Sequence, residues 1–182
     1  FRVEDGLTVI SDGGVKLVIP AGTTVTPDDP LWGSEFIPPV IVGVKTVSLP
    51  GGGDAEVAVA VEVGSAGTAF TLDRAARLVL PGAAGSRAGF TEPGGAFTLI
   101  TAECAADSQE AGDAADRDCV IDVGDDLVVW TKHFSTFAAL ATAVLPVTGG
   151  EGASGGWLAA VLLLAGLTAV VVARRRRVAA ER

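Results

Sequence analysis

Few side chains of this chain could carry out catalysis. His133 is its single histidine, so a Ser/His/Asp arrangement would have to use it, and Ser135 lies two residues further on. No G-x-S-x-G elbow accompanies them, and the glycines at 51–53 lack the G-x-x-x-x-G-K-[ST] pattern of a phosphate-binding loop. The simpler interpretation is structural: His133 and Ser135 cap a turn between strands, while Phe134 and Phe137 pack in the core. We therefore expect that the chain is not an enzyme and needs no cofactor.

Carboxylates are concentrated between residues 107 and 126. Ca²⁺ takes roughly six to eight oxygen ligands, and the candidates in this segment are Asp113, Asp116, Asp118 and Asp122. The segment contains no D-x-D-x-D-G loop, so a solvated acidic surface explains it more simply. We expect no bound metal, and name these four residues as the candidates for a calcium site.

The end of the chain has the composition of a membrane segment with a basic tail. Residues 157–173 are 17 consecutive residues without a charge, and a helix of that length spans about 26 Å. The basic tail, residues 174–182, begins with Arg174, Arg175, Arg176 and Arg177. Arginines next to a membrane span stay cytoplasmic, which leaves everything upstream outside the cell. An ordinary C-terminal membrane anchor would give the same pattern.

A pentapeptide makes a more specific prediction. Residues 142–156 form a tether and a Gly-rich spacer that contains Leu145, Pro146, Val147, Thr148 and Gly149. The pentapeptide, the apolar run and the arginines, in that order, resemble the LPxTG sorting signal of Gram-positive cell-wall proteins. This resemblance implies that a sortase thiolate attacks the carbonyl of Thr148, expels Gly149 with the tail, and passes the chain to an amine of the wall precursor. The implied partners are a sortase, peptidoglycan joined covalently at Thr148, and the plasma membrane before sorting.

The part that would remain after sorting is acidic. Residues 1–148 contain eight Lys and Arg against twenty Asp and Glu, a net charge of −12. This charge argues against nucleic acid or anionic lipid as a partner. The chain has no Met, hence neither an initiator residue nor a signal peptide, so we expect a fragment or a processed form with undetermined sequence upstream. The bias toward Ala, Gly, Val and Arg suggests a GC-rich genome such as that of an actinobacterium.

Cys104 and Cys119 are the two cysteines of the chain. An even number in an exported protein predicts a disulfide. It would close a loop of 14 residues, 105–118, and the chain-entropy model gives it about 3 kcal/mol of stabilisation. A structural role is favoured over a metal site, because no CxxC spacing is present.

Short apolar runs separated by Gly and Pro turns predict an all-β domain over residues 1–141. The Ala-rich segments show no 3.6-residue apolar period, so we expect no helix in them. The predicted fold is an antiparallel sandwich, followed by the single hydrophobic helix of the tail. The expected strands lie at 15–19, 40–49, 57–63, 77–80, 97–101, 119–123, 127–130 and 136–140.

Two segments add a second resemblance. Residues 14–23 (GVKLVIPAGT) and 127–138 (LVVWTKHFSTFA) resemble the opening and closing signatures of ZU5-like β-sandwich modules, over roughly residues 13–141. In some ZU5-type proteins a His-Phe-Ser triplet breaks its own backbone between Phe and Ser. The resemblance implies Ser135 as nucleophile on the Phe134 carbonyl and His133 as base, with an ester formed and then hydrolysed.

The sequence thus predicts a secreted, peptidoglycan-anchored surface protein with a non-catalytic structural or adhesion role, cleaved by a sortase between Thr148 and Gly149. Two alternatives stay open. One is a self-cleaving module that breaks the Phe134–Ser135 bond. The other is the anchoring end of an extracellular enzyme whose catalytic part lies upstream.

Overall fold

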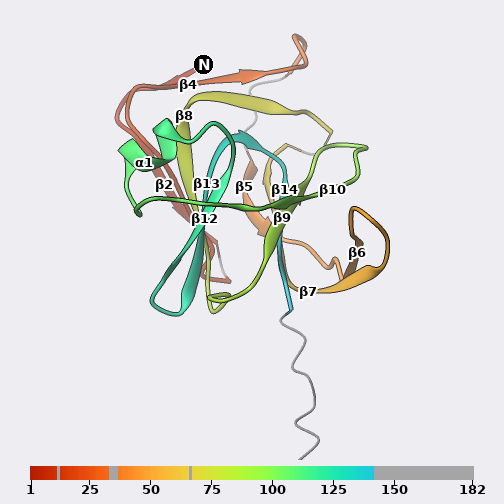
Figure 1. Cartoon of the computed structure of the whole chain (residues 1–182). Helices are drawn as coiled ribbons and strands as arrows, with labels where there is room; N and C mark the ends of the chain where they lie inside the picture. Colours follow the sequence, from red (N-terminus) through yellow and green to blue (C-terminus); the bar gives the residue numbers. More distant parts are fainter. Residues whose placement is uncertain (12, 33–36, 66, 142–182) are drawn as a thin grey trace, which may run out of the picture. The chain divides into compact units, whose positions relative to one another are not determined.

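The computed structural model describes residues 1–11, 13–32, 37–65 and 67–141, which form two β-sheets with one short helix (Figure 1). The described residues all belong to one compact unit. The predicted tether, membrane helix and basic tail lie outside the described residues.

The first sheet has eight strands. Its main order is β1-β4-β8-β13-β12-β11, with β3 also paired to β8 and β2 paired to β3. The strands are β1 (Arg2–Val3), β2 (Leu7–Ile10), β3 (Lys16–Ile19), β4 (Thr23–Pro27), β8 (Phe70–Leu80), β11 (Ala102–Glu103), β12 (Cys119–Val123) and β13 (Asp126–Phe134).

The second sheet has six strands in the order β10-β9-β14-β7-β5, with β6 paired to β7. The strands are β5 (Ile37–Ile41), β6 (Thr46–Ser48), β7 (Asp54–Gly64), β9 (Ala88–Thr91), β10 (Phe97–Ile100) and β14 (Thr136–Leu140). The long strand β7 pairs with β14 on one side and with β5 on the other. The last strand of the domain, β14, lies between β7 and β9 and is therefore hydrogen-bonded on both sides.

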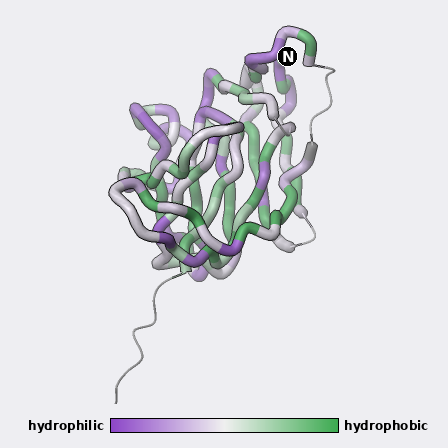
Figure 2. The backbone as a smooth tube through the Cα atoms, turned by 90° about the vertical axis from the view of Figure 1, so that its right-hand side faces the viewer, coloured by the Kyte–Doolittle hydropathy of each residue, from purple (hydrophilic) through white to green (hydrophobic). Residues whose placement is uncertain are grey.

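The main core combines side chains from both sheets. Leu78 and Val129 of the first sheet and Val61 and Phe137 of the second are fully buried in it. Their burial follows from alternation, because successive side chains of a strand point to opposite faces. Figure 2 shows hydrophobic residues concentrated along the strands and hydrophilic ones mostly in the connections.

The first sheet also buries part of its outer face. Trp130 and Val128 of β13 pack there with Ala75 and the two cysteines. The helix α1 (Gln109–Ala114) belongs to the loop that covers this face. A Cβ atom at Gly112 would lie 2.5 Å from Cε3 of Trp130, so glycine lets the helix approach the indole ring.

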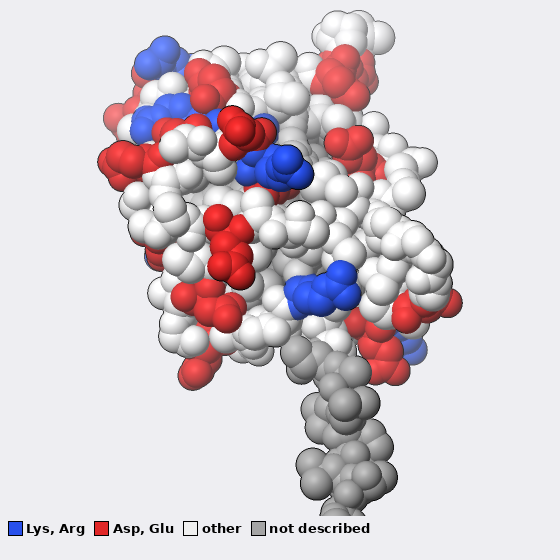
Figure 3. Space-filling view, viewed as in Figure 1, with Lys and Arg blue, Asp and Glu red and all other residues white. Residues whose placement is uncertain are grey.

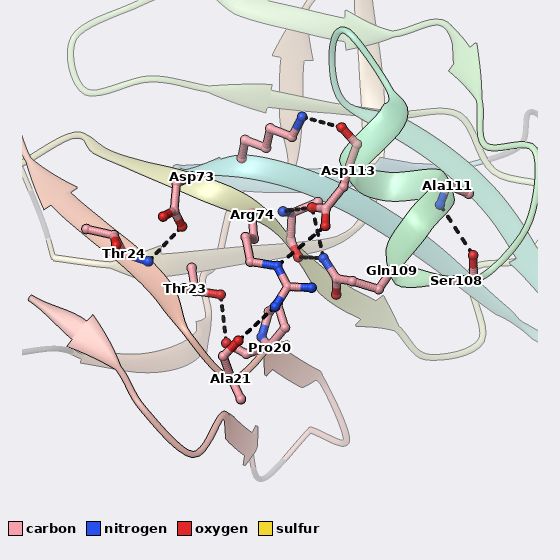
Figure 4. Close-up of polar contacts among 12 residues, drawn as sticks. Pro20, Ala21, Thr23, Thr24, Asp73, Arg74, Ser108, Gln109, Ala111 and Asp113 are labelled. Carbon is pink, nitrogen blue, oxygen red and sulfur yellow. Dashed lines mark hydrogen bonds and ion pairs between the residues drawn. The ribbon is translucent and has the colours of Figure 1, made fainter.

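Side chains of α1 complete an interrupted part of the sheet. Ala75 lies between the segments of β8 that pair with β3 and with β4. Its N–H donates to Oδ1 of Asp113 (2.7 Å), and its carbonyl accepts from Nε2 of Gln109 (2.9 Å) (Figure 4). Because buried backbone groups must be paired, these bonds fix the helix to the sheet.

The chain passes directly from one sheet to the other at Ser135. Strand β13 ends at Phe134 in the first sheet, and β14 begins at Thr136 in the second. Ser135 is itself 5% exposed, and its carbonyl accepts a hydrogen bond from the N–H of Val63 (3.1 Å). A single buried residue therefore forms the corner between the two layers.

The all-β, sandwich-like architecture is confirmed, with four differences from the sequence prediction. The pairing of β11 with β12 is parallel. The expected strand 40–49 is two strands, β5 and β6. The expectation of no helix was wrong for α1, whose N-terminus is capped by Ser108, with the Ala111 N–H donating to its Oγ (3.3 Å). The strands that were not predicted are short or polar: β1, β2, β4, β9 and β11.

Candidate functional site

A chain of hydrogen bonds joins three side chains at the corner between the sheets. Nδ1 of His133 lies 3.0 Å from Oγ of Ser135, and Nε2 of the same ring lies 2.7 Å from Oδ2 of Asp118. His133 comes from β13, Ser135 follows that strand, and Asp118 is the residue before β12. The order carboxylate, imidazole, hydroxyl is the order of groups in a Ser/His/Asp triad.

The direction of these bonds follows from the chemistry of the groups. An ionised carboxylate only accepts, so Nε2 must carry a proton and donate it to Asp118. In the neutral imidazole Nδ1 then has a free lone pair, which accepts the hydroxyl proton of Ser135. Asp118 thus selects the tautomer in which His133 can act as a base toward Ser135.

The three groups are largely shielded from water. The side chain of Asp118 is 9% exposed and that of His133 is 22% exposed. The imidazole ring lies against two aromatic rings: Phe90, at 4.4 Å between centroids, and Phe137, stacked at 5.5 Å. These contacts leave the ring little rotational freedom and strengthen its hydrogen bonds by excluding water.

A β-bulge places His133. The register of β13 against β8 shifts between Thr131 and His133. Within the bulge, Oγ1 of Thr131 donates to the carbonyl of His133 (3.0 Å) and accepts from its N–H (3.2 Å). Val129 and Phe134 both enter the main core, although an odd spacing of five would put them on opposite faces of a regular strand. The bulge therefore re-aims the end of β13.

Two pockets border the site. Phe134 and Ser135 line one of about 240 Å³, together with residues of β7 and β9. His133 and Asp118 line another of about 280 Å³, together with Phe90, Arg117 and residues of β10. Ser135 lines the first of these pockets and His133 the second, and Glu92 lines both.

The disulfide between Cys104 and Cys119 is present, as the sequence predicted. Cys119 is 1% exposed and pairs in register with Trp130 of β13. Because Asp118 directly precedes Cys119, its backbone is fixed beside β13 close to the bulge. The disulfide thereby helps to position a member of the hydrogen-bonded chain.

A second anchor holds the start of the same loop. Nε and Nη2 of Arg77 donate to the two carboxylate oxygens of Asp107, at 2.7 and 2.6 Å, and Nε1 of Trp130 donates to Oδ1 at 3.1 Å. The hydrogen bonds from Arg77 lower the pKa of Asp107 against an opposing effect of burial; the charge of Arg77 and the bond from Trp130 lower it further. The same carboxylate raises the pKa of Arg77. Paired arginine–carboxylate bonds of this kind are strong and directional.

The four calcium candidates are not brought together. Asp118 binds His133, Asp113 binds backbone and side chains of β8 and α1, and Asp122 accepts from the N–H of Gly85. Asp116 is exposed. Within the described residues, no group of three or more His, Cys, Asp or Glu side chains could hold a metal ion. The sequence identified Asp118 only as a possible metal ligand and missed its contact with His133, since no local pattern predicts that pairing.

Acidic residues are spread over the surface. Figure 3 shows Asp and Glu distributed across the visible face of the domain, with Lys and Arg scattered among them. On this face the acidic side chains do not gather in a single cluster.

The sorting motif, Leu145 to Gly149, lies outside the described residues, and so do the arginines 174–177. Within the described part of the chain, no helix has the length and apolar character needed to cross a membrane.

Comparisons of the chain with family models, with curated proteins and with solved structures found no match.

Proposed function

We propose that this chain is a sortase substrate that displays a disulfide-stapled, ZU5-like β-domain on the wall of a Gram-positive bacterium. The LPVTG pentapeptide, followed by the apolar run and the arginines, carries the proposal. In this account a sortase cleaves between Thr148 and Gly149 and joins Thr148 to peptidoglycan. The role of the domain is structural or adhesive, and it is secreted before it is anchored.

The end of the domain supports this function. The last strand, β14, lies between two other strands, and the N–H of Ala141 donates to the carbonyl of Glu56 at 2.9 Å. Four residues separate Leu140 from Leu145. A short tether of this kind would let a fully folded domain remain next to the wall while the motif enters a sortase.

Expression in a Gram-positive host with a functional secretion signal tests the proposal. We expect the protein in the peptidoglycan-linked fraction of the wild-type host, and in the membrane fraction of a strain that lacks its sortase. Thr148→Ala should reproduce the sortase-deficient result in the wild-type host, whereas Thr142→Ala, in the tether but outside the motif, should not. An equal distribution in both strains would exclude sortase processing.

A second function, self-cleavage of the Phe134–Ser135 bond, is favoured by the 3.0 Å contact between Nδ1 of His133 and Oγ of Ser135. After such a break, β14 would keep its ladders to β7 and β9. The anchor would then remain attached by strand pairing until the domain is unfolded. A denaturing gel tests this function: we expect two fragments, one beginning at Ser135, and a single intact band would contradict it.

A further inference from the structure

We propose that Asp118 is the positioning residue for self-cleavage at Phe134–Ser135, and that the Cys104–Cys119 disulfide keeps it in place, so that cleavage follows oxidation of the domain. This proposal rests on the second function above. Asp118 and the disulfide lie outside the His-Phe-Ser triplet in the sequence, and the proposal gives both a role in the reaction of that triplet.

The reaction needs a base at Oγ of Ser135 and an acid at its backbone nitrogen. The Oγ–H proton passes to Nδ1 of His133 as Oγ bonds to the carbonyl carbon of Phe134. The C–N bond then breaks, and the imidazolium returns the proton to the nitrogen of Ser135, which becomes an α-amine. Water hydrolyses the resulting ester to the Phe134 carboxylate and the free hydroxyl of Ser135.

Asp118 supports this sequence of proton transfers from the far side of the ring. By accepting from Nε2 at 2.7 Å, it keeps the lone pair of the neutral ring on Nδ1, toward Ser135. It also stabilises the imidazolium that forms when His133 takes the proton. The low exposure of both side chains, 9% and 22%, makes this charge stabilisation stronger than it would be in water.

The disulfide connects this geometry to the redox state. On the β12 side, Asp118 is held by the register pair of Cys119 with Trp130. On the loop side, the chain returns to the first sheet through Cys104, whose N–H donates to the carbonyl of Val120 at 2.9 Å. Reduction would remove the covalent link between the two ends of the loop of residues 105–118, next to Asp118, while the hydrogen bonds of Asp107 and Asp113 to the first sheet remain. Since disulfides persist outside the cell and not in the reducing cytosol, the precursor would stay intact until export.

A pocket beside the bond has room for the water of the second step. Phe134 and Ser135 line a pocket of about 240 Å³, which is ample for several water molecules.

The test uses the full chain, produced in reduced form and then oxidised, with fragments followed by denaturing gel and intact mass. We expect wild-type protein to yield a fragment beginning at Ser135, and Ser135→Ala to yield none. Asp118→Asn should slow cleavage by about 10²–10⁴-fold, and Asp118→Glu should restore part of the rate. A simple loss of structure would not be reversed by the conservative variant.

Two controls separate positioning from stability. Asp116→Asn removes an exposed carboxylate of the same loop, and Asp107→Asn removes a loop anchor without touching His133. Both should cleave at rates close to that of the wild type. Cleavage of the wild type should slow on reduction with dithiothreitol, whereas the double variant Cys104→Ser/Cys119→Ser should be slow with or without the reductant.

The outcomes separate a failure of the positioning role of Asp118 from a failure of self-cleavage itself. Equal rates for wild type and Asp118→Asn, or a rate that does not respond to reduction, would overturn the present proposal and leave self-cleavage standing. If the oxidised wild type gives no fragment, even with hydroxylamine added to capture the ester, self-cleavage itself is wrong and the positioning role falls with it.

Discussion

Nε2 of His133 lies 2.7 Å from Oδ2 of Asp118, which is 15 residues earlier in the sequence and is the last residue of the disulfide-bonded loop. This bond connects two parts of the domain that lie apart in the sequence. One part is the acidic loop on the outer face of the first sheet, and the other is the corner at Ser135 where the chain changes sheets. The loop therefore reaches the corner through Asp118, whereas Ala114 and Asp116 of the same loop are exposed.

The disulfide should contribute substantially to stability. Cys104→Ser/Cys119→Ser opens a loop of 14 residues, and we expect the free energy of unfolding to fall by about 3 kcal/mol on the chain-entropy model. Chemical denaturation of the variant and of the wild type measures this loss. Wild-type protein in excess reductant is the matched control and should unfold at the same midpoint as the variant. A midpoint equal to that of the oxidised wild type would show that the bridge adds no stability.

Asp107→Asn should destabilise the folded domain at neutral pH by roughly 1–2 kcal/mol, because Arg77 and Trp130 lose a charged acceptor. Asp116→Asn, at an exposed position of the same loop, should change stability by less than about 0.5 kcal/mol. Urea unfolding at pH 7 checks both. Equal stabilities for the two variants would contradict the anchoring role of Asp107.

The hydrogen bonds between Arg77 and Asp107 also predict that the stability of the domain falls at acid pH. The pKa of Asp107 is lowered in the folded state from its ordinary value of 3.8, chiefly by the hydrogen bonds from Arg77. Between the folded pKa and 3.8, Asp107 is protonated in the unfolded chain and still ionised in the folded domain. Its contribution to the free energy of unfolding is therefore complete above pH 3.8 and is lost as pH falls through the folded pKa. We expect the stability difference between wild type and Asp107→Asn to shrink over this window. A difference that stays constant down to pH 2 would refute the assignment.

Gly112→Ala should destabilise the domain although alanine is the better helix former. The added Cβ would lie 2.5 Å from the indole of Trp130, and overpacking of this kind costs about 1–3 kcal/mol. Helix propensity alone would stabilise the variant by about 1 kcal/mol. Ala114→Gly, at an exposed position of α1, measures the propensity effect by itself. The sign of the Gly112→Ala change decides between packing and propensity.

The basic tail should determine whether the chain is retained for sorting. Replacing the four arginines 174–177 by glutamine removes the charges that hold the chain at the membrane. We expect much of the protein to appear in the medium instead of the wall, as measured by immunoblot of cell fractions. Arg182→Gln, which removes a single charge at the end of the tail, should leave the distribution unchanged.

Much of the fold is predictable from local patterns. Strands β12 and β14 lie where the alternation and the turns put them, and the disulfide follows from the cysteine count. The helix α1 was missed because its six residues are too short for an apolar period to show. Its stability comes from Ser108 and from contacts of Gln109 and Asp113 with β8, which are tertiary.

The site was predictable only in part. The resemblance to the His-Phe-Ser triplet paired His133 with Ser135, and the structure brings them within hydrogen-bonding distance. The contact with Asp118 depends on the register of β12 against β13 and on the bulge at Thr131. Neither register nor a bulge can be read from residue types alone, because both result from long-range pairing.

The most direct test of wall anchoring is mass spectrometry of the protein released from native cell walls by a peptidoglycan hydrolase. If a sortase anchors the chain, we expect a C-terminal peptide that ends at Thr148 and carries a peptidoglycan stem fragment on its carboxyl group. Recovery of the protein from the membrane fraction, with Arg174–Arg177 still attached, would contradict it.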